Sequence, residues 1–221
     1  PNKNKKKFCG KPIIFWPIKN SLKSNIFDKV YVSTDDKSLS KLGKKYGANV
    51  PFLRDKKLAD DYTGLVPVLK WVNDEYKKMG KVFDDIFCIM PAAPLLKSVD
   101  LSKAYRKYKK FNSEHPLLVV SSYSVPIEWA FYRNKDGILT PKNKKSLQMR
   151  SQDIKQAFYE AGPFSIFNAK HLDEKNCFEK TSYISLLIDK SRAVDIDNHE
   201  DLELAKILFL GSKKLKQLEN E

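Results

Sequence analysis

"DIFCIMPAAPLLKSVDLSKAYRKYKKFNSEHPLLVVSS", residues 85–122, is the stretch that decides the fold. It opens on a short apolar run, turns at Pro91–Pro94, continues as a mixed polar segment and ends on the apolar run 116–122. Short apolar runs of this length are typical of buried strands, and the segment between them has helical spacing. We therefore predict a strand, a helix with Ser98 as its N-cap, and a second strand.

The same alternation extends in both directions along the chain. Strand–helix alternation indicates an α/β fold with a mainly parallel sheet and helices on both faces, and its ligand is expected at the carboxyl ends of the strands. We predict one doubly wound, Rossmann-like domain over residues 1–221. Further strands are expected at 30–33, 163–169, 183–189 and 192–197, and further helices after Pro12, at 37–47, at 64–80 and from about His199.

Residues 123–162 break this alternation. They contain Pro126, the turn sequence "NKDG" and Pro141, with short aromatic runs between them. We interpret the segment as an inserted hairpin-like excursion. Its aromatic side chains, Trp129, Phe131 and Tyr132, are expected to pack either on a partner subunit or on their own domain.

Composition excludes several classes of protein. The net charge is +14, but only five of the 41 basic residues are arginine and the lysines are spread along the chain, which argues against a nucleic-acid groove. No apolar run is long enough to span a membrane and no signal peptide is evident. Three widely separated cysteines, Cys9, Cys88 and Cys177, are typical of a reduced cytoplasmic protein.

Two carboxylates, Asp195 and Asp197, follow one another with period 2 at the end of the predicted strand 192–197. Side chains at this spacing point to the same face, so their like charges need compensation, for which a divalent cation is one candidate. Asp197 has an alternative role, because with Glu200 three residues later it forms a potential capping box for the last helix.

Six ordered blocks resemble the cytidylyltransferases that activate nine-carbon sugar acids, and the resemblance covers almost the whole chain. The blocks are "PNKNKKKFCGKPII", "FDKVYVSTDD", "YGANVPFLRDKKLADDYT", "MPAAPLL", "RSQD" and "RAVDIDNHEDLELA". The third and fifth are most similar to enzymes that act on pseudaminic acid. Sialic-acid enzymes commonly have Gln at the position of Met90, which argues against N-acetylneuraminate. The family opens with a strand and a phosphate-binding loop, and we expect this chain to start at the last residues of that loop.

The resemblance implies a nucleotide-diphospho-sugar transferase-like fold, the substrates CTP and a sugar acid, the cofactor Mg²⁺ (with Mn²⁺ as an alternative) and a homodimer formed through residues 123–162. Asp195 and Asp197 are the implied metal ligands, and Lys3 the implied cation near the phosphates. The implied substrate contacts are Asn4, Ser33, Pro91, Arg150 and Gln152.

Alternatives remain open for several of these residues. Lys3 is one of many lysines that solvent could surround, and Arg150 could form a loop ion pair with Asp153. Arg192 could hold Asp195 or Asp197 in place. Other expected substrates are N-acetylneuraminate, legionaminate and an eight-carbon sugar acid. A nucleotide-binding relative without catalysis and a basic nucleic-acid-binding protein are the competing classes.

Overall fold

A computed structural model describes residues 3–60, 62–173 and 182–220. Its centre is a four-stranded sheet in the order β3-β7-β4-β8, formed by β3 (Asp85–Ile89), β7 (Phe158–Asn168), β4 (Leu117–Ser122) and β8 (Ile184–Leu187). β7 pairs antiparallel with both β3 and β4, whereas β4 and β8 are parallel. Three strands therefore run in one direction and β7 opposes them. The α/β fold is confirmed, with a mixed sheet.

The antiparallel placement of β7 has a local cause. The chain leaves β4 into the 123–162 excursion, which contains no crossover helix in the described structure, and returns along β4 as β7. A strand that returns without a crossover pairs antiparallel with the strand it left. The excursion thus extends a long β4–β7 ribbon.

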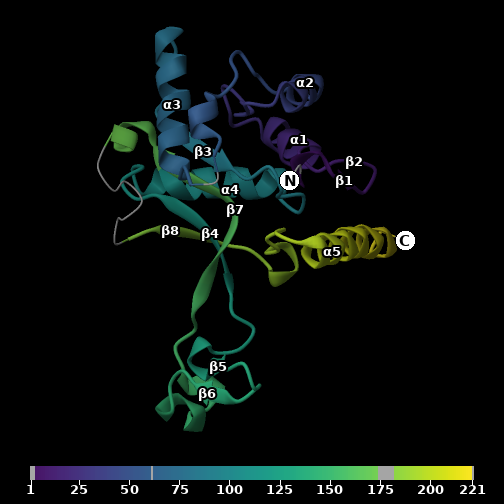
Figure 1. Ribbon diagram of the computed structural model, residues 1–221, viewed down its shortest axis with the longest axis vertical. Helices are drawn as coiled ribbons and strands as arrows, with labels where there is room; N and C mark the ends of the chain where they lie inside the picture. The colour runs from purple at the N-terminus through teal and green to yellow at the C-terminus, as the bar shows by residue number, and fades with distance from the viewer. Residues whose placement is uncertain (1–2, 61, 174–181, 221) are drawn as a thin grey trace.

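Helices cover both faces of the sheet (Figure 1). On one face, α4 (Ser98–Lys110) buries Leu101 and Tyr108 against Leu117 of β4 and Ile166 of β7. On the other face, α3 (Leu65–Lys78) covers the neighbouring side chains of β3 and β7, which alternate between the two faces. The N-cap residue of α4 lies one position earlier in the sequence than expected, because it is Lys97 and not Ser98.

The amino-terminal third packs beside this sheet. It comprises the turn η1 (Lys3–Lys5), the hairpin β1 (Lys7–Phe8) and β2 (Lys11–Pro12), α1 (Phe15–Ser24), α2 (Lys37–Lys45) and η2 (Lys56–Leu58). The strand expected at 30–33 is reduced to a single parallel bridge between Tyr31 and Asn49. The backbone there nevertheless pairs with Asn49 as a strand would, since Val32 N donates a hydrogen bond to Asn49 O over 3.1 Å.

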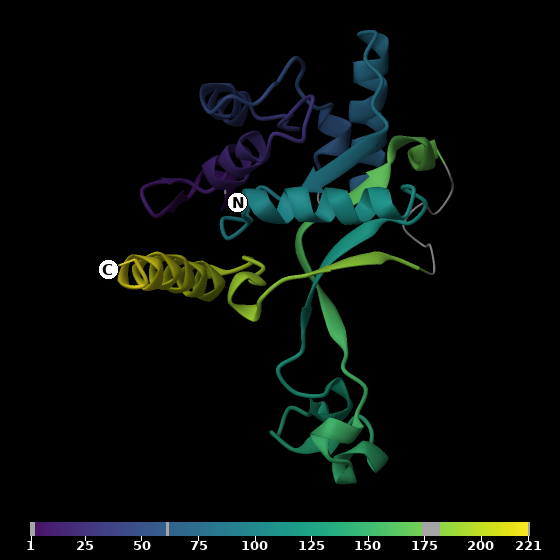
Figure 2. The ribbon, with the colours of Figure 1, turned by 180° about the vertical axis from the view of Figure 1, so that it is seen from behind.

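The last helix, α5 (His199–Leu218), lies alongside the β1–β2 hairpin and α1, as Figures 1 and 2 show. Phe209 of α5 packs edge-on against Phe8 and Trp16, with ring centroids 5.2 and 4.7 Å apart. The two ends of the described chain therefore meet through aromatic rings. η6 (Ala169–Asp173) and η7 (Lys190–Arg192) precede this helix and flank β8.

Two expectations for residues 192–200 were wrong. Residues 193–197 form no strand, although the predicted alternation persists, with Ile196 buried between exposed Asp195 and Asp197. The capping box is shifted by one residue. Asn198 accepts from Asp201 N and Asn198 N donates to Asp201, each over 3.0 Å. Asp and Asn cap a helix equally well, so the sequence pattern placed the start of the helix correctly at His199 but assigned its cap to Asp197 instead of Asn198.

The excursion forms an arm that projects away from the sheet (Figure 1). It carries the hairpin β5 (Phe131–Arg133) and β6 (Leu139–Pro141) and the turns η3 (Ile127–Trp129), η4 (Lys145–Gln148) and η5 (Ser151–Asp153). Trp129 packs within the arm and donates to Ser146 O over 2.9 Å, whereas Tyr132 is 65% exposed. Packing on its own domain is therefore confirmed for Trp129, and packing on a partner subunit stays a prediction for Tyr132.

Among the described residues, no helix is long and apolar enough to cross a membrane. Cys9 and Cys88 are free thiols, and Cys177 lies outside the described residues.

Candidate active site

Lys3 of η1 contacts the segment that carries the paired carboxylates. Its Nζ donates to Ile196 O over 2.9 Å and lies 3.3 Å from Asp197 Oδ1. The two ends of the chain thus bring a cation and an anion together at one place. The resemblance implied Lys3 as a cation near the phosphates and Asp197 as a metal ligand, and both roles stay predictions.

Apolar packing holds the carboxylate segment in position. Ile196 is buried with Phe8 and Leu202, and Ala92 of the Pro91–Pro94 turn joins the same cluster. Asp195 and Asp197, on either side of Ile196, are left exposed. The turn that begins at Pro91 therefore contributes to the same apolar cluster as the residue between the two carboxylates.

Arg192 does not hold either carboxylate, contrary to one of the alternatives above. Its guanidinium forms an ion pair with Asp100 in the first turn of α4 and lies 3.6 Å from Asp189. Asp100 is 6% exposed and also accepts from Lys97 N over 3.1 Å. The pair fixes the start of the 193–197 segment on α4.

Two predicted contact residues present buried polar atoms without partners. Asn4 Oδ1 and Ser33 Oγ are buried, and neither has a hydrogen-bond partner within the described part of the chain. Buried polar atoms in folded proteins are nearly always paired, so both are candidates for ligand contacts. Ser33 follows the extended segment that bridges to Asn49, at its carboxyl end.

An ion pair ties η1 to the start of α2. Lys5 contacts Asp36, which also caps α2 by accepting from Ser38 N and Leu39 N. The hydrogen bonds from Lys5 and then from Ser38 lower the pKa of Asp36 below its usual value. η1 therefore spans from α2 to the Asp195–Asp197 segment, with Asn4 between its two ion-paired lysines.

Sequence reasoning missed Arg54. Its guanidinium lies 3.7 Å from Asp35, its backbone N donates to Thr34 O over 2.8 Å, and its Nε is buried with no partner in the described structure. Arg54 thus adds a cation beside Asp35, two residues after Ser33. The sequence signal that could have found Arg54 is its place at the end of the block "VPFLR". This block directly follows Asn49, the residue that bridges to Tyr31.

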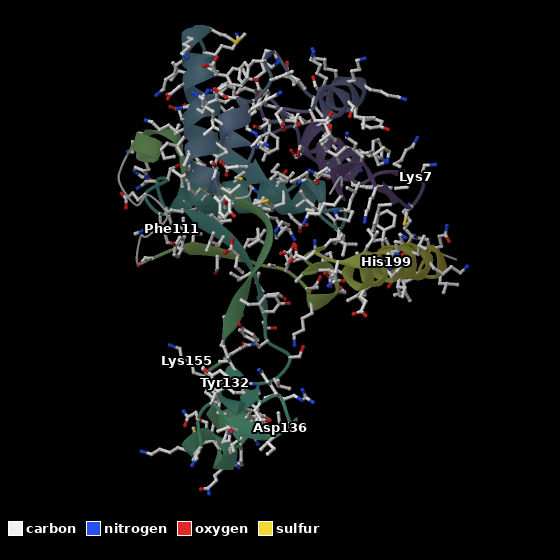
Figure 3. All side chains as sticks on the ribbon, viewed as in Figure 1. Lys7, Phe111, Tyr132, Asp136, Lys155 and His199 are labelled. Carbon is white, nitrogen blue, oxygen red and sulfur yellow. The ribbon has the colours of Figure 1, made fainter. Side chains whose placement is uncertain are left out.

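Arg150 and Gln152 do not lie with the other predicted site residues. Both lie on the arm, whose labelled residues Tyr132 and Lys155 are far from His199, the neighbour of the carboxylate segment (Figure 3). Arg150 forms the bidentate pair with Asp153 that was its alternative role, with distances of 2.8 and 3.1 Å. Within one chain, neither residue can share a ligand with Lys3.

A hollow of about 350 Å³ lies beside the Pro91 turn. Met90, the last residue before the turn, and Glu160 of β7 both line it. This volume is within the range of small-molecule sites.

The carboxylates suit a hard cation that needs few protein ligands. Mg²⁺ typically binds one or two carboxylates and completes its shell with water and substrate phosphates. No group of three or more His, Cys, Asp or Glu side chains in the described residues could cage a metal. Asp195 and Asp197 therefore fit Mg²⁺ delivered with a phosphate ligand, and they do not fit a cation held by protein alone.

Helices cover both faces of a mixed sheet, and cations, carboxylates and polar atoms without partners in the described residues gather around η1. The fold is similar to that of a solved CMP:2-keto-3-deoxy-manno-octonic acid synthetase complexed with CTP, with a TM-score of 0.70, 12% identity and coverage of 96% of this chain and 93% of that one.

The family model described as cytidylyltransferase matches residues 1–219, and the chain belongs to that family. It is 35% identical over 209 residues to the pseudaminic acid cytidylyltransferase of Campylobacter jejuni, covering 95% of this chain and 90% of that protein. It is 26% identical over 219 residues to the CMP-N,N'-diacetyllegionaminic acid synthase of Legionella pneumophila, covering 97% and 93%. The family and these relatives define a CMP-sugar-acid synthetase.

Proposed function

We propose that the chain transfers CMP from CTP to pseudaminic acid, a nine-carbon sugar acid, and releases pyrophosphate. The observation that carries the proposal is the contact of Lys3 with Ile196 O and Asp197, beside Asn4 Oδ1, which is buried and has no partner among the described residues. The similarity to the Campylobacter jejuni enzyme over nearly the whole chain supports the choice of sugar acid. N-acetylneuraminate, legionaminate and an eight-carbon acid are the alternatives.

The reaction joins two anions, so neutralisation and positioning are its main requirements. The anomeric oxygen of the sugar acid attacks the α-phosphorus of CTP, the bond to the bridging oxygen breaks, and pyrophosphate departs with its electron pair. The hydroxyl proton passes to solvent. In this proposal Lys3 offsets the charge of the triphosphate, while Asn4 and Ser33 orient the nucleotide.

Asp195 and Asp197 would hold Mg²⁺ in this scheme. When bound, the cation withdraws charge from the phosphate oxygens and stabilises the leaving pyrophosphate. Lys3 lies against Asp197 in the structure and balances its charge. We propose that Lys3 turns toward the phosphates when a nucleotide is bound.

The arm favours a homodimer. Phe131, Tyr132, Ile138 and Leu139 on its hairpin are between 47% and 65% exposed. Exposed apolar residues gathered on one element are typical of an interface. We propose that the arm pairs with a second copy, and that any contact of Arg150 or Gln152 with the sugar acid is made in the partner's site.

Pyrophosphate release by the full-length native chain tests the proposal. CTP and Mg²⁺ are supplied with pseudaminic, N-acetylneuraminic, N,N'-diacetyllegionaminic or the eight-carbon acid in separate reactions. Release with pseudaminic acid supports the proposal. Release with another acid only keeps the reaction and changes the substrate. Calorimetric binding of CTP without release from any acid would establish a nucleotide-binding relative without catalysis.

A further inference from the structure

The last helix, α5, buries one of its faces and turns the other outward. Leu202, Ala205 and Phe209 pack in the apolar cluster that holds Phe8 and Ile196. In Figures 1 and 2, α5 runs along the outside of the molecule, with the β1–β2 hairpin beside it. The face of α5 opposite to this cluster is therefore open to solvent.

An apolar stripe runs along the outward face. We call it the α5 stripe, and it consists of Leu204, Ile207, Gly211, Leu215 and Leu218. Its four large side chains are between 48% and 67% exposed, and no neighbouring atom lies within 4 Å of the place that a side chain at Gly211 would take. Surface helices usually present polar residues to solvent, so a row of large apolar side chains indicates a docking surface.

The spacing of the α5 stripe is that of a helix pair. Its successive residues are 3, 4, 4 and 3 positions apart, 3.5 on average. A repeat of 3.5 residues keeps a narrow row of side chains facing a second helix, whereas a helix that packs on a globular core presents a wider apolar face. The occupant that fits the stripe is therefore another helix.

The α5 stripe is also symmetric about its middle residue. Gly211 lies seven positions from Leu204 and from Leu218, and four positions from Ile207 and from Leu215. If two copies of the helix run antiparallel with a two-fold axis at Gly211, each of these side chains faces its counterpart at the same distance from the axis. A contact between identical surfaces requires this self-complementarity.

We propose that α5 pairs antiparallel with α5 of a second copy of the chain through the α5 stripe, with Gly211 at the crossing point. Gly211 has no side chain, so the two helices can approach closely where they cross. The inference depends neither on the proposed function nor on the pairing of the arm.

The charges of α5 favour the antiparallel direction. Three acids lie near its beginning and three lysines near its end, namely Glu200, Asp201 and Glu203, and Lys213, Lys214 and Lys216. A parallel pair would place acids beside acids and lysines beside lysines, whereas an antiparallel pair places the acids of each copy in the same half as the lysines of the other. The acids also disfavour an anionic lipid surface, so a second copy is the better occupant.

The contact is small, which determines when it forms. The α5 stripe extends over about 21 Å, because each helical residue rises about 1.5 Å, and a helix is about 10 Å wide. This footprint is well below the area that stable complexes bury. We therefore expect the α5 pair at high protein concentration only, where it joins dimers that the arm has already formed.

Cysteine cross-linking tests the pairing. Facing Cα atoms lie about 5 Å apart when two helix axes are about 10 Å apart, and a disulfide can span this distance. Gly211→Cys should therefore cross-link to itself on oxidation at about 300 µM protein and not at about 5 µM, because the contact is weak. Every variant also carries Cys9→Ser and Cys177→Ser, which leaves buried Cys88 as the remaining native thiol.

A second pair of variants tests the direction. In an antiparallel pair the two copies of residue 204 lie about 21 Å apart, whereas residue 204 of one copy faces residue 218 of the other. Leu204→Cys and Leu218→Cys should therefore give no cross-link when oxidised separately and a cross-linked species when mixed. These variants keep the test decisive even if Gly211→Cys fails to fold, which circular dichroism would show.

Ile207→Asp tests whether the α5 stripe carries the contact. Added to Gly211→Cys, it places a carboxylate against Leu215 of the second copy, and the cross-linked fraction at about 300 µM should fall at least ten-fold. Val82→Asp, at a 77% exposed side chain between α3 and β3, is the matched control and should leave the cross-linked fraction unchanged.

Three outcomes would overturn the inference. Cross-linking of Leu204→Cys and of Leu218→Cys each with itself would indicate a parallel pair. Absence of cross-links in all folded variants would show that no second copy covers the α5 stripe. If the unsubstituted protein then co-sediments with vesicles of phosphatidylserine and phosphatidylcholine and Ile207→Asp does not, a lipid surface is the occupant instead.

Discussion

Lys3 Nζ lies 2.9 Å from Ile196 O and 3.3 Å from Asp197 Oδ1, so the first described residue of the chain contacts a segment almost two hundred residues later. Lys5, two residues further on, forms an ion pair with Asp36 at the start of α2. The short turn η1 therefore links the two regions that hold the predicted metal and nucleotide contacts.

Replacing Lys3 tests the proposed role of this turn. We expect Lys3→Met to lower kcat by about 10²-fold, as the loss of one charge-stabilising donor typically does. The side chain is exposed and stability should change little. Lys6→Met, at an exposed lysine of the same run, is the control and should retain full activity. Equal losses in the two variants would mean that only the overall charge matters.

The carboxylate pair is tested through metal binding itself. Asp195→Asn and Asp197→Asn should each weaken Mn²⁺ binding in the presence of CTP, measured by electron paramagnetic resonance, because each removes an anionic oxygen ligand. Glu200→Gln, an exposed acid three residues beyond Asp197, should bind Mn²⁺ normally. Unchanged binding in both aspartate variants would place the metal elsewhere.

Buried and exposed Arg–Asp pairs should differ in their contribution to stability. Arg192→Ala leaves Asp100 buried without its cation, and we expect a loss of about 3–5 kcal/mol in the free energy of unfolding. Arg150→Ala breaks a pair whose arginine is 72% exposed, and the loss should be at most about 1 kcal/mol. Urea denaturation measures both. Comparable losses would contradict the anchoring role given to Arg192.

The Lys5–Asp36 pair predicts a specific dependence on pH. Hydrogen bonds from Lys5 and Ser38 lower the pKa of Asp36 in the folded protein below its ordinary value of 3.8. Its stabilising effect is therefore complete above about pH 4 and is lost as the pH falls through the lowered folded pKa. The difference in unfolding free energy between the unsubstituted protein and Asp36→Asn should shrink on acidification. A difference that is constant from pH 7 to pH 2 would contradict this assignment.

The arm predicts the state of assembly. We expect the protein to sediment as a dimer of 25.5 kDa subunits, and Tyr132→Asp with Ile138→Asp to convert it to monomers. Ile207→Asp on α5, at a side chain of similar exposure, is the control and should leave the dimer intact. Dissociation by the α5 substitution alone would move the interface away from the arm.

Much of the fold follows from local sequence patterns. The spacing of apolar residues indicated α1, α2, α3, α4 and α5, as well as the strands β3, β4, β7 and β8. The direction of β7 was not evident, because it depends on whether residues 123–162 cross over the sheet or return along it. The segment 193–197 has strand-like alternation but no partner strand among the described residues, and alternation alone cannot show whether a partner exists.

The site was predictable only in part. Family resemblance singled out Lys3 and Asp197, which the structure brings into contact, but the sequence contains no sign that Arg192 is paired with Asp100, ninety-two residues away. Arg54 was overlooked because one arginine in an extended segment carries no spacing pattern. The separation of Arg150 from Lys3 depends on the reach of the arm, which is a property of the tertiary structure.

The most direct test of the central claim is phosphorus NMR of the full-length native chain incubated with CTP, Mg²⁺ and pseudaminic acid. The proposal predicts equal amounts of a CMP-sugar phosphodiester and pyrophosphate, and neither product with Asp195→Asn under the same conditions. Equal product formation by the Asp195→Asn variant, or persistence of unreacted CTP with the unsubstituted protein, would contradict it.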